Sequence, residues 1–342
     1  MARTKTTMSA QAAMPADGKP TLKTIAQISG LAVPTVSRAL NDAPDIGSKT
    51  KELVRKIAQD IGYVPNRAGV RLRTGRTNVI SLVISTEHDN QMTRLISSVA
   101  SKLDGTRFHL NVTPYSPLDD IMKPVRYIVE TGSADAIILN QIEPEDARVA
   151  YLQDRKFPFA THGRSKWAAT HAYYDFDNAA FGRLATDQLA QRKRGSIMAI
   201  APPIQQSYSR HFIDGLHAGG DTNGQIINIV DGVTSDDKPA IIIPAIIAYL
   251  RANPRTDAIV AASSTATMAS VVALETLGLT VGQDIDVISK EGTPFLKMFR
   301  AQILTVSESV DAAGEFLALA AIQAIKDPDL PPMQFLEIPD AT

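Results

Sequence analysis

Cationic and hydrogen-bonding side chains are concentrated at one end of this 342-residue sequence. Residues 1–80 contain 13 of the 35 Lys and Arg residues but only 5 of the 36 Asp and Glu residues, which is a net charge of +8. The rest of the chain carries −9, so the total of −1 conceals a strong asymmetry. A cationic end attached to an acidic body is typical of a protein that binds a polyanion such as nucleic acid.

Three short amphipathic helices are predicted to position these cationic side chains. Thr21 can cap the first helix and Gly30 can end it, whereas Pro34 favours the start of the second. A third helix is expected from Ser48 to Gly62. Apolar residues at helical spacing would form one small core: Leu22, Ile25, Ala26, Val36, Ala39, Leu40, Leu53, Val54, Ile57, Ala58 and Ile61. On the second helix an outward-facing set remains: Val33, Pro34, Ser37, Arg38 and Asn41.

This pattern favours a helix-turn-helix unit. Two helices joined by a short glycine-containing turn, with a polar and basic outer face on the second, are typical of a unit whose second helix enters the major groove of DNA. An ordinary small helical subdomain is the alternative.

The amino-acid sequence of the same region is similar to that of a known family. The segments TLKTIAQISGLAVPTVSRALN (21–41) and YVPNRAGVRLRTGRT (63–77) resemble the lac and galactose repressor family of bacterial transcription regulators, and a weaker resemblance extends through the rest of the chain. The resemblance implies DNA-binding residues at these positions: Thr21, Leu22, Val33, Pro34, Thr35, Ser37, Arg38, Asn41, Thr50, Tyr63, Asn66, Gly69 and Leu72.

Two of these positions depart from the family's usual readout of bases. The family's base readers at the start of the second helix fall on Val33 and Pro34, whose side chains can neither donate nor accept a hydrogen bond. We expect these two to recognise thymine methyl groups or DNA shape, and hydrogen-bonded readout to depend mainly on Arg38.

The segment after the three helices is expected to act as a hinge. In the family, the stretch matching Asn66 to Leu72 forms a short helix on DNA, and the leucine matching Leu72 wedges into the minor groove. Gly69 replaces an expected alanine, which costs a helix roughly 0.5–1 kcal/mol, so this hinge is predicted to order only on operator DNA. A plain basic linker is the alternative.

From Asn78 onward, short β-rich runs alternate with helix-length stretches. The runs are VISLVIS (79–85), FHLNVTP (108–114), AIILN (136–140), FPFATH (157–162), SIMAIAP (196–202), IINIV (226–230), AIVAAS (258–263), DVIS (286–289) and ILTVS (303–307). Nearly continuous apolar strands separated by helices predict parallel sheets that are covered on both faces. The expected fold class is therefore an N-terminal all-α helix-turn-helix headpiece and an α/β body of two doubly wound parallel-sheet subdomains. The resemblance implies that this body is similar to a periplasmic sugar-binding protein.

Polar residues just after these strands are candidates for a small-molecule site, because ligands of open α/β sheets bind beyond the carboxyl ends of the strands. Side chains of Arg, Asp and Glu can make paired hydrogen bonds to neighbouring sugar hydroxyls. The candidates for binding a sugar-like effector between two lobes are Arg164, Asp175, Asp177, Arg210, Ser264, Glu291 and Glu308. For each one, an exposed or lobe-bracing side chain is the alternative. The family's usual residues are replaced here by Ser263, Ser264 and the run Lys290-Glu291-Gly292. The sugar that a relative binds is therefore not assumed to bind this protein.

Several functional classes are disfavoured by what the sequence lacks. The absence of cysteine excludes disulfides and thiolate metal sites, and the six histidines do not follow a metal-binding spacing. Neither a phosphate-binding glycine motif nor a set of nucleophile, base and orienting group is recognisable, so we predict no enzyme activity, no cofactor and no metal. With neither a signal peptide nor an apolar run of membrane-spanning length, a cytoplasmic location is expected.

The hypothesis is a homodimeric transcription repressor of carbohydrate genes, with a loose tail (1–20), a DNA-binding domain (21–65), a hinge (66–77) and an effector-binding and dimerisation body (78–342). Two headpieces would read a pseudo-palindromic double-stranded operator, and a sugar in the interlobe cleft would control the binding. The alternatives are a carbohydrate-binding protein without a DNA role and an enzyme that acts on a sugar.

Overall fold

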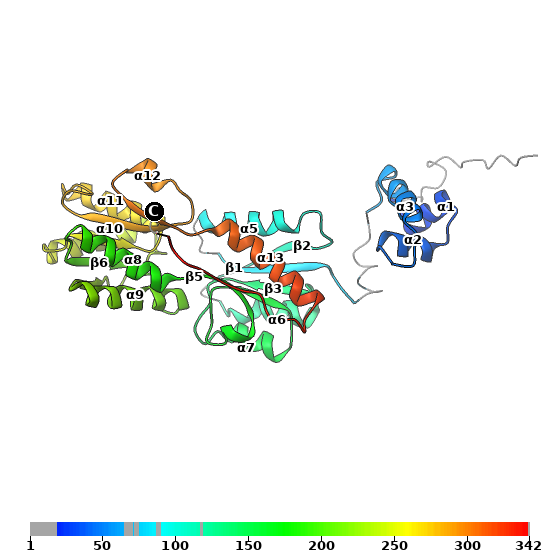
Figure 1. Ribbon diagram of the computed structural model, residues 1–342, viewed down its shortest axis with the longest axis horizontal. Helices are drawn as coiled ribbons and strands as arrows, with labels where there is room; N and C mark the ends of the chain where they lie inside the picture. Colours follow the sequence, from blue (N-terminus) through cyan, green and yellow to red (C-terminus); the bar gives the residue numbers. More distant parts are fainter. Residues whose placement is uncertain (1–18, 65–70, 72–74, 87–89, 117–118, 341–342) are drawn as a thin grey trace, which may run out of the picture. The chain divides into compact units, whose positions relative to one another are not determined.

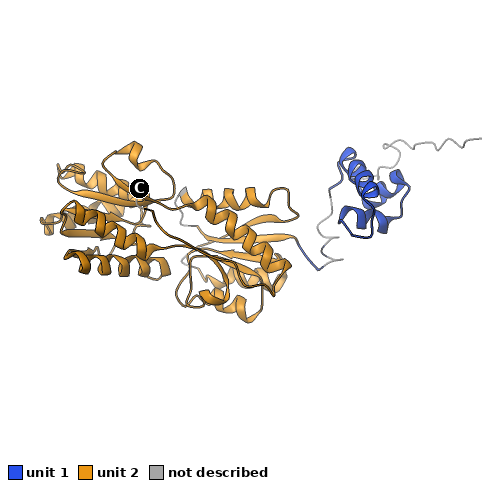
Figure 2. Cartoon of the chain, viewed as in Figure 1, with its two compact units in different colours: residues 1–77 blue, residues 78–342 orange. Residues whose placement is uncertain are grey.

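A computed structural model describes residues 19–64, 71, 75–86, 90–116 and 119–340. The chain divides into two compact units, Met1–Thr77 and Asn78–Thr342 (Figure 2). Residues 1–18 of the predicted tail lie outside the described residues. The predicted DNA contacts Asn66, Gly69 and Leu72 also lie outside them.

The described part of the first unit consists of the three predicted helices, α1 (Leu22–Ser29), α2 (Val33–Leu40) and α3 (Ser48–Asp60) (Figure 1). Thr21 caps α1 by accepting a hydrogen bond from the Thr24 amide, and Gly30 ends α1 with a φ of 70°. Ile25, Val36, Ala39 and Val54 are fully buried in one shared core. The capping residues and the core therefore confirm the helical interpretation of this region.

One expected core residue of α3 faces solvent instead. The Leu53 side chain is 47% exposed, whereas the neighbouring Val54 is fully buried and Ala58 is 8% exposed. Val54 and Ala58 lie on one face, one turn apart, and Leu53 is rotated by about 100° from Val54. The buried face of α3 is thus narrower than its apolar pattern suggests.

The second unit contains two parallel sheets, one in each lobe. The first lobe has the strand order β11-β5-β4-β3-β1-β2, with β1 (Val79–Ser85), β2 (His109–Tyr115), β3 (Ala136–Leu139), β4 (Phe159–His162), β5 (Ala172–Phe176) and β11 (Gln334–Glu337). The second lobe has the order β10-β9-β8-β6-β7, with β6 (Ser196–Ile200), β7 (Ile226–Ile229), β8 (Ala258–Ala261), β9 (Asp286–Glu291) and β10 (Leu304–Ser307). Because the ladders are parallel, the carboxyl ends of the strands share one edge in each sheet.

Helices cover both faces of the first sheet. Alternation along β1 sends Leu82 to one face and Val83 to the other, and both are fully buried. The Leu82 face packs against α5 (Asn90–Leu103) and α13 (Val310–Lys326). The Val83 face packs against α6 (Met122–Thr131) and α7 (Ala147–Asp154). A short 3₁₀ helix, η2 (Ala168–Thr170), precedes β5.

The second sheet is covered in the same way. One face packs against α8 (Asn178–Gln191) and α9 (Ser207–Asn223), and the other against α10 (Pro239–Ala252) and α11 (Ser264–Thr276). Helices α8 and α9 touch backbone to backbone, since a Cβ placed on Gly215 would lie 2.2 Å from the Ala179 carbonyl oxygen. The four-residue helix α12 (Leu296–Phe299) lies between β9 and β10. These findings confirm the predicted class of two parallel-sheet lobes.

The chain passes between the lobes at the ends of β5, β10 and β11 (Figure 1). The three passages lie side by side, because the Asp177 amide donates to the Glu337 carbonyl at 2.8 Å and the Ser309 amide donates to Glu337 Oε1 at 2.9 Å. Strand β11 was not among the predicted strands. Its residues are largely exposed at the sheet edge, so they do not form the continuous apolar run that marks the inner strands.

Candidate functional site

The outer face of α2 differs in part from the face predicted from the sequence. Pro34, Arg38 and Asn41 are exposed as expected, but Ser37 is only 8% exposed and Val33 packs in part against the core. Helix α2 contacts both α1 and α3, so a wider arc of it is buried than a single apolar stripe would bury. The prediction that Ser37 faces outward is therefore wrong. Its role in DNA binding remains a prediction.

The other predicted contacts of the headpiece that the structure describes are distributed over its three helices and the residues next to them. Thr21 is exposed at the start of α1, and its side chain belongs to the cap of that helix. Leu22, Thr35, Thr50 and Tyr63 are partly buried.

Arg38, the predicted hydrogen-bonding reader of bases, has an ionic partner within the headpiece. Its guanidinium lies 2.5 Å from the Asp45 carboxylate, and both side chains are about half exposed. A second acid of the α2–α3 turn, Asp42, pairs with Arg55 and lies 3.8 Å from Lys51. The cationic surface of the headpiece is thus interrupted by two acids at the end of α2.

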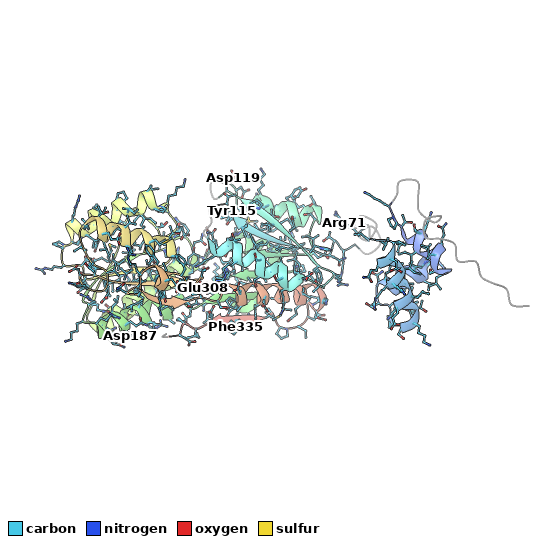
Figure 3. All side chains as sticks on the ribbon, turned by 90° about the horizontal axis from the view of Figure 1, so that it is seen from above. Arg71, Tyr115, Asp119, Asp187, Glu308 and Phe335 are labelled. Carbon is cyan, nitrogen blue, oxygen red and sulfur yellow. The ribbon has the colours of Figure 1, made fainter. Side chains whose placement is uncertain are left out.

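A cavity of about 920 Å³ lies in the second unit between its two lobes. Its walls come mainly from residues at the carboxyl ends of strands in both sheets, as the rule for open α/β sheets predicts. Figure 3 places Glu308 where the two lobes meet. The polar side chains at its base are Asn140, His162, Asp175, Asn178, Lys290 and Glu308.

Lys290 and Glu308 form an ion pair in this cavity. Lys290 Nζ lies 2.9 Å from Glu308 Oε2 and donates a hydrogen bond to Asn178 Oδ1 at 3.2 Å. Burial alone would raise the pKa of the Glu308 carboxyl, but the ammonium of Lys290 holds it below its usual value. Glu308 is therefore ionised near neutral pH.

His162, at the end of β4, connects this pair to the first lobe. Its Nδ1 lies 3.2 Å from Asn140 Oδ1, and its Nε2 lies 4.0 Å from Glu308 Oε1. Burial lowers the pKa of the His162 imidazole, although the carboxylates of Glu308 and Asp175 oppose that shift. The neutral ring can then hydrogen-bond on both of its nitrogens without adding a charge to the cavity.

Asp175, near the carboxyl end of β5, lines the cavity. Its carboxylate accepts a hydrogen bond from Arg164 Nε at 2.6 Å. Burial raises the pKa of the Asp175 carboxyl, although Arg164 opposes the shift. Arg164 therefore orients this carboxylate from behind the cavity wall.

Among the seven predicted effector residues, Asp175 and Glu308 line the cavity. The other five are not among the described residues that line it, although Arg164 contacts the Asp175 carboxylate. Asp177 caps α8 by accepting from the Ala180 amide, and Glu291 accepts from the Leu296 amide. Ser264 begins α11 behind Ser263, which does line the cavity, and Arg210 is exposed on α9.

The cavity is also lined by a segment that was not predicted from the sequence. The segment from Ser235 to Lys238 lines the cavity just before α10. Asp237 is fixed there by accepting hydrogen bonds from the Thr234 amide and hydroxyl, at 2.7 and 3.0 Å. This polar run follows strand β7, so the strand-end rule that selected the other candidates could have found it.

The cavity is lined by hydrogen-bonding groups. Its amide, carboxylate and ammonium groups can pair with neighbouring hydroxyls of a polar ligand. Within the described ranges, no group of three or more His, Asp or Glu side chains could hold a metal ion. In the part of the chain that the structure describes, every helix is too short or too polar to cross a bilayer.

Comparison with known proteins identifies both units. Residues 21–66 match the family described as "Bacterial regulatory proteins, lacI family", and residues 126–297 match "Periplasmic binding protein domain". Over 89% of this chain and 87% of the relative, the sequence is 27% identical to the HTH-type transcriptional regulator AglR of Rhizobium meliloti (strain 1021). The headpiece of this chain belongs to the lacI family of bacterial regulatory proteins, and its body is a periplasmic-binding-protein-like domain. With this pair of domains the chain is a DNA-binding transcriptional regulator rather than an enzyme.

Two solved structures share the fold of this lacI-family protein. The lac repressor dimer bound to operator and the anti-inducer ONPF superposes with a TM-score of 0.79 at 19% identity, covering 94% of this chain and 97% of that one. A complex of the transcriptional regulator CelR with cellobiose has a TM-score of 0.69 at 21% identity, covering 94% and 98%. At such identities the likeness concerns the fold, a helical headpiece followed by a two-lobed α/β body.

Proposed function

We propose that this lacI-family regulator is a homodimeric, cytoplasmic repressor of carbohydrate genes and that a sugar in the interlobe cavity switches its affinity for operator DNA. The observation that carries the proposal is the base of the cavity, where hydrogen-bonding groups of both lobes converge. Asn140 and His162 come from the first lobe, and Lys290 and Glu308 from the second. Paired amide and carboxylate groups suit the neighbouring hydroxyls of a sugar.

The proposed effector is an uncharged disaccharide. The ionic groups at the base already neutralise one another in the pairs Lys290 with Glu308 and Arg164 with Asp175, so they favour a neutral, hydroxyl-rich ligand. A cavity of about 920 Å³ offers space for more than one sugar ring. The relative CelR was solved with the disaccharide cellobiose, which supports this class of ligand.

The switch would depend on lobe closure. A sugar that contacts groups of both lobes binds their closed arrangement more tightly than an open one, so it shifts the population towards closure. Operator and sugar affinities are then linked reciprocally, with a coupling of about 1–3 kcal/mol, or roughly 5–150-fold.

On DNA, we assign the sequence-specific readout to α2 of two headpieces on the half-sites of a pseudo-palindrome. Arg38 would read a base edge in the major groove, and Leu72 of the hinge segment (66–77) would wedge into the minor groove. A solved dimer of the related lac repressor on its operator supports this two-fold arrangement.

Titration calorimetry of the full-length protein with cellobiose, maltose, sucrose and glucose tests the effector. Gel-shift titrations on duplexes selected from random sequence then test the switch. We expect one disaccharide to bind and to change operator affinity by roughly 5–150-fold. Asp175→Asn should abolish this response, whereas the matched control Asp187→Asn, on an exposed acid of α8, should keep it. A sugar that binds without changing operator affinity, or a panel in which none binds, would overturn the proposal.

A further inference from the structure

The loop that follows β3 forms part of the cavity wall in an unusual backbone conformation. Asn140 and Gln141 line the cavity, and Gln141 has a φ of 54°. A residue with a Cβ rarely adopts this left-handed conformation, and it persists only where surrounding contacts hold it. Contacts of the loop with its surroundings are therefore expected to hold this conformation.

A buried ion pair lies directly behind the loop. Arg148 and Asp146 are 1% and 0% exposed, and they make two parallel contacts, Nε to Oδ1 at 3.0 Å and Nη2 to Oδ2 at 2.7 Å. Burial alone would raise the pKa of the Asp146 carboxyl, but Arg148 holds it below its usual value, so both groups stay charged.

Both members of the pair also bind the backbone of the loop. Arg148 Nη2 donates to the carbonyl oxygens of Gln141 at 2.7 Å and Asn140 at 3.2 Å. Asp146 Oδ2 accepts from the Glu143 amide at 3.1 Å. The guanidinium thus fixes the two carbonyls that flank the left-handed turn.

The same loop contacts groups on both sides of the cavity. The Asn140 side chain meets His162 of the first lobe, as described above. The Ile142 carbonyl accepts a hydrogen bond at 2.8 Å from the amide of Ser207, the first residue of α9 in the second lobe. A change in the conformation of Gln141 would displace both contacts.

We propose that Asp146 and Arg148 are positioning residues for effector binding, which hold Gln141 in its left-handed conformation so that Asn140, Gln141 and Ile142 face the sugar and the second lobe. This inference rests on the proposed function of the cavity. A buried ion pair by itself is a weak source of stability, because desolvation of the charges offsets their attraction. The hydrogen bonds of the pair to the loop therefore position the backbone of the loop rather than add to the stability of the fold.

The test uses the full-length double variant Asp146→Leu/Arg148→Met. Removing both charges leaves no unpaired buried charge, so this variant is expected to fold. Its affinity for the disaccharide bound by the wild type should fall by roughly 5–150-fold, the range that corresponds to the strain at Gln141. When Gln141→Gly is present in both proteins, the same double change should cost much less affinity, because glycine adopts a positive φ without strain.

Hydrogen exchange provides a readout that needs no sugar. The peptide carrying the Ser207 amide should exchange faster in the double variant, since the Ile142 carbonyl would no longer be held. Unchanged exchange there would overturn the positioning role of the pair. A loss of sugar affinity that is the same with and without the Gln141→Gly substitution would overturn the link to the left-handed turn. If none of the sugars binds even the wild type, the proposed function fails, and exchange at Ser207 still decides whether the pair positions the loop.

Discussion

Lys290 of β9 and Glu308, just after β10, form an ion pair at the base of the interlobe cavity, with 2.9 Å between Nζ and Oε2. Their side chains are 10% and 7% exposed, so water screens the pair poorly. Lys290 Nζ also donates to Asn178 Oδ1 and lies 5.1 Å from the centre of the Phe176 ring. Removing only one of the two charges would therefore leave the other buried without its ionic partner.

Lys290→Met is expected to lower the free energy of unfolding by roughly 3–5 kcal/mol, because it leaves the Glu308 carboxylate buried and unpaired. The double variant Lys290→Met/Glu308→Leu should recover most of that loss, because no buried charge remains. Urea unfolding followed by circular dichroism measures both effects. A Lys290→Met protein as stable as the wild type would show that Glu308 has other compensation.

His162→Gln should make the stability of the protein less sensitive to mild acid. Burial lowers the pKa of His162 in the folded chain, so the unfolded chain binds more protons below about pH 6.5 and stability falls as the pH decreases. The variant lacks this proton uptake. The midpoint of thermal unfolding should thus fall less between pH 7.5 and 5.5 in the variant than in the wild type.

Other groups contribute to the pH dependence of both proteins. Burial also lowers the pKa of His171 and His211, which act in the same direction as His162. The raised pKa of Asp175 acts in the opposite direction. An identical pH slope in variant and wild type would show that His162 does not titrate with unfolding.

Arg38→Ala should weaken specific operator binding by roughly 5–150-fold, the range for one bidentate contact to a base, without changing the midpoint of thermal unfolding. Competitive gel shifts on specific and scrambled duplexes measure this ratio. Lys56→Ala, which removes an exposed charge of α3, serves as the control. Equal loss on both duplexes would make Arg38 a phosphate contact.

Asp45→Asn should strengthen DNA binding, because it releases Arg38 from its partner in the α2–α3 turn. The pair is exposed, so its loss should change the free energy of unfolding by less than about 1 kcal/mol. Glu52→Gln removes the same charge from α3 and controls for net charge alone. Equal gains in DNA affinity from both substitutions would exclude competition for Arg38.

Gly215→Ala should destabilise the second lobe by at least roughly 1–3 kcal/mol, because its Cβ would lie 2.2 Å from the Ala179 carbonyl oxygen. Backbone atoms of α8 cannot yield as a flexible side chain could. Gly195→Ala is the matched control, since a Cβ there meets nothing within 4 Å. In calorimetry, the midpoint temperature of unfolding should be clearly lower for Gly215→Ala than for Gly195→Ala. Equal midpoints would show that α8 and α9 can move apart.

Local signals in the sequence determined the elements of this protein. The caps Thr21 and Gly30 and the apolar spacing of α1 to α3 depend on neighbours within one or two turns, so they could be predicted without a tertiary structure. Most strands were also visible as apolar runs, which are nearly continuous in strands such as β1 and β8 because helices bury both faces of the sheet there, whereas the edge strand β11 was not visible in this way. The same rule selected Asp175 and Glu308 as strand-end residues of the cavity.

Only the tertiary structure decided which of these residues meet. Lys290 and Glu308 lie at the ends of the neighbouring strands β9 and β10, and Asn140 and His162 at the ends of β3 and β4. The sequence does not show which of these strand-end side chains come within hydrogen-bond distance, and only the structure pairs them. The burial of Ser37 depends on two helices packing against α2 at once. The left-handed turn at Gln141 depends on a guanidinium behind it. Contacts of this kind arise from the order of strands and the packing of layers, which long-range burial selects and local sequence does not encode.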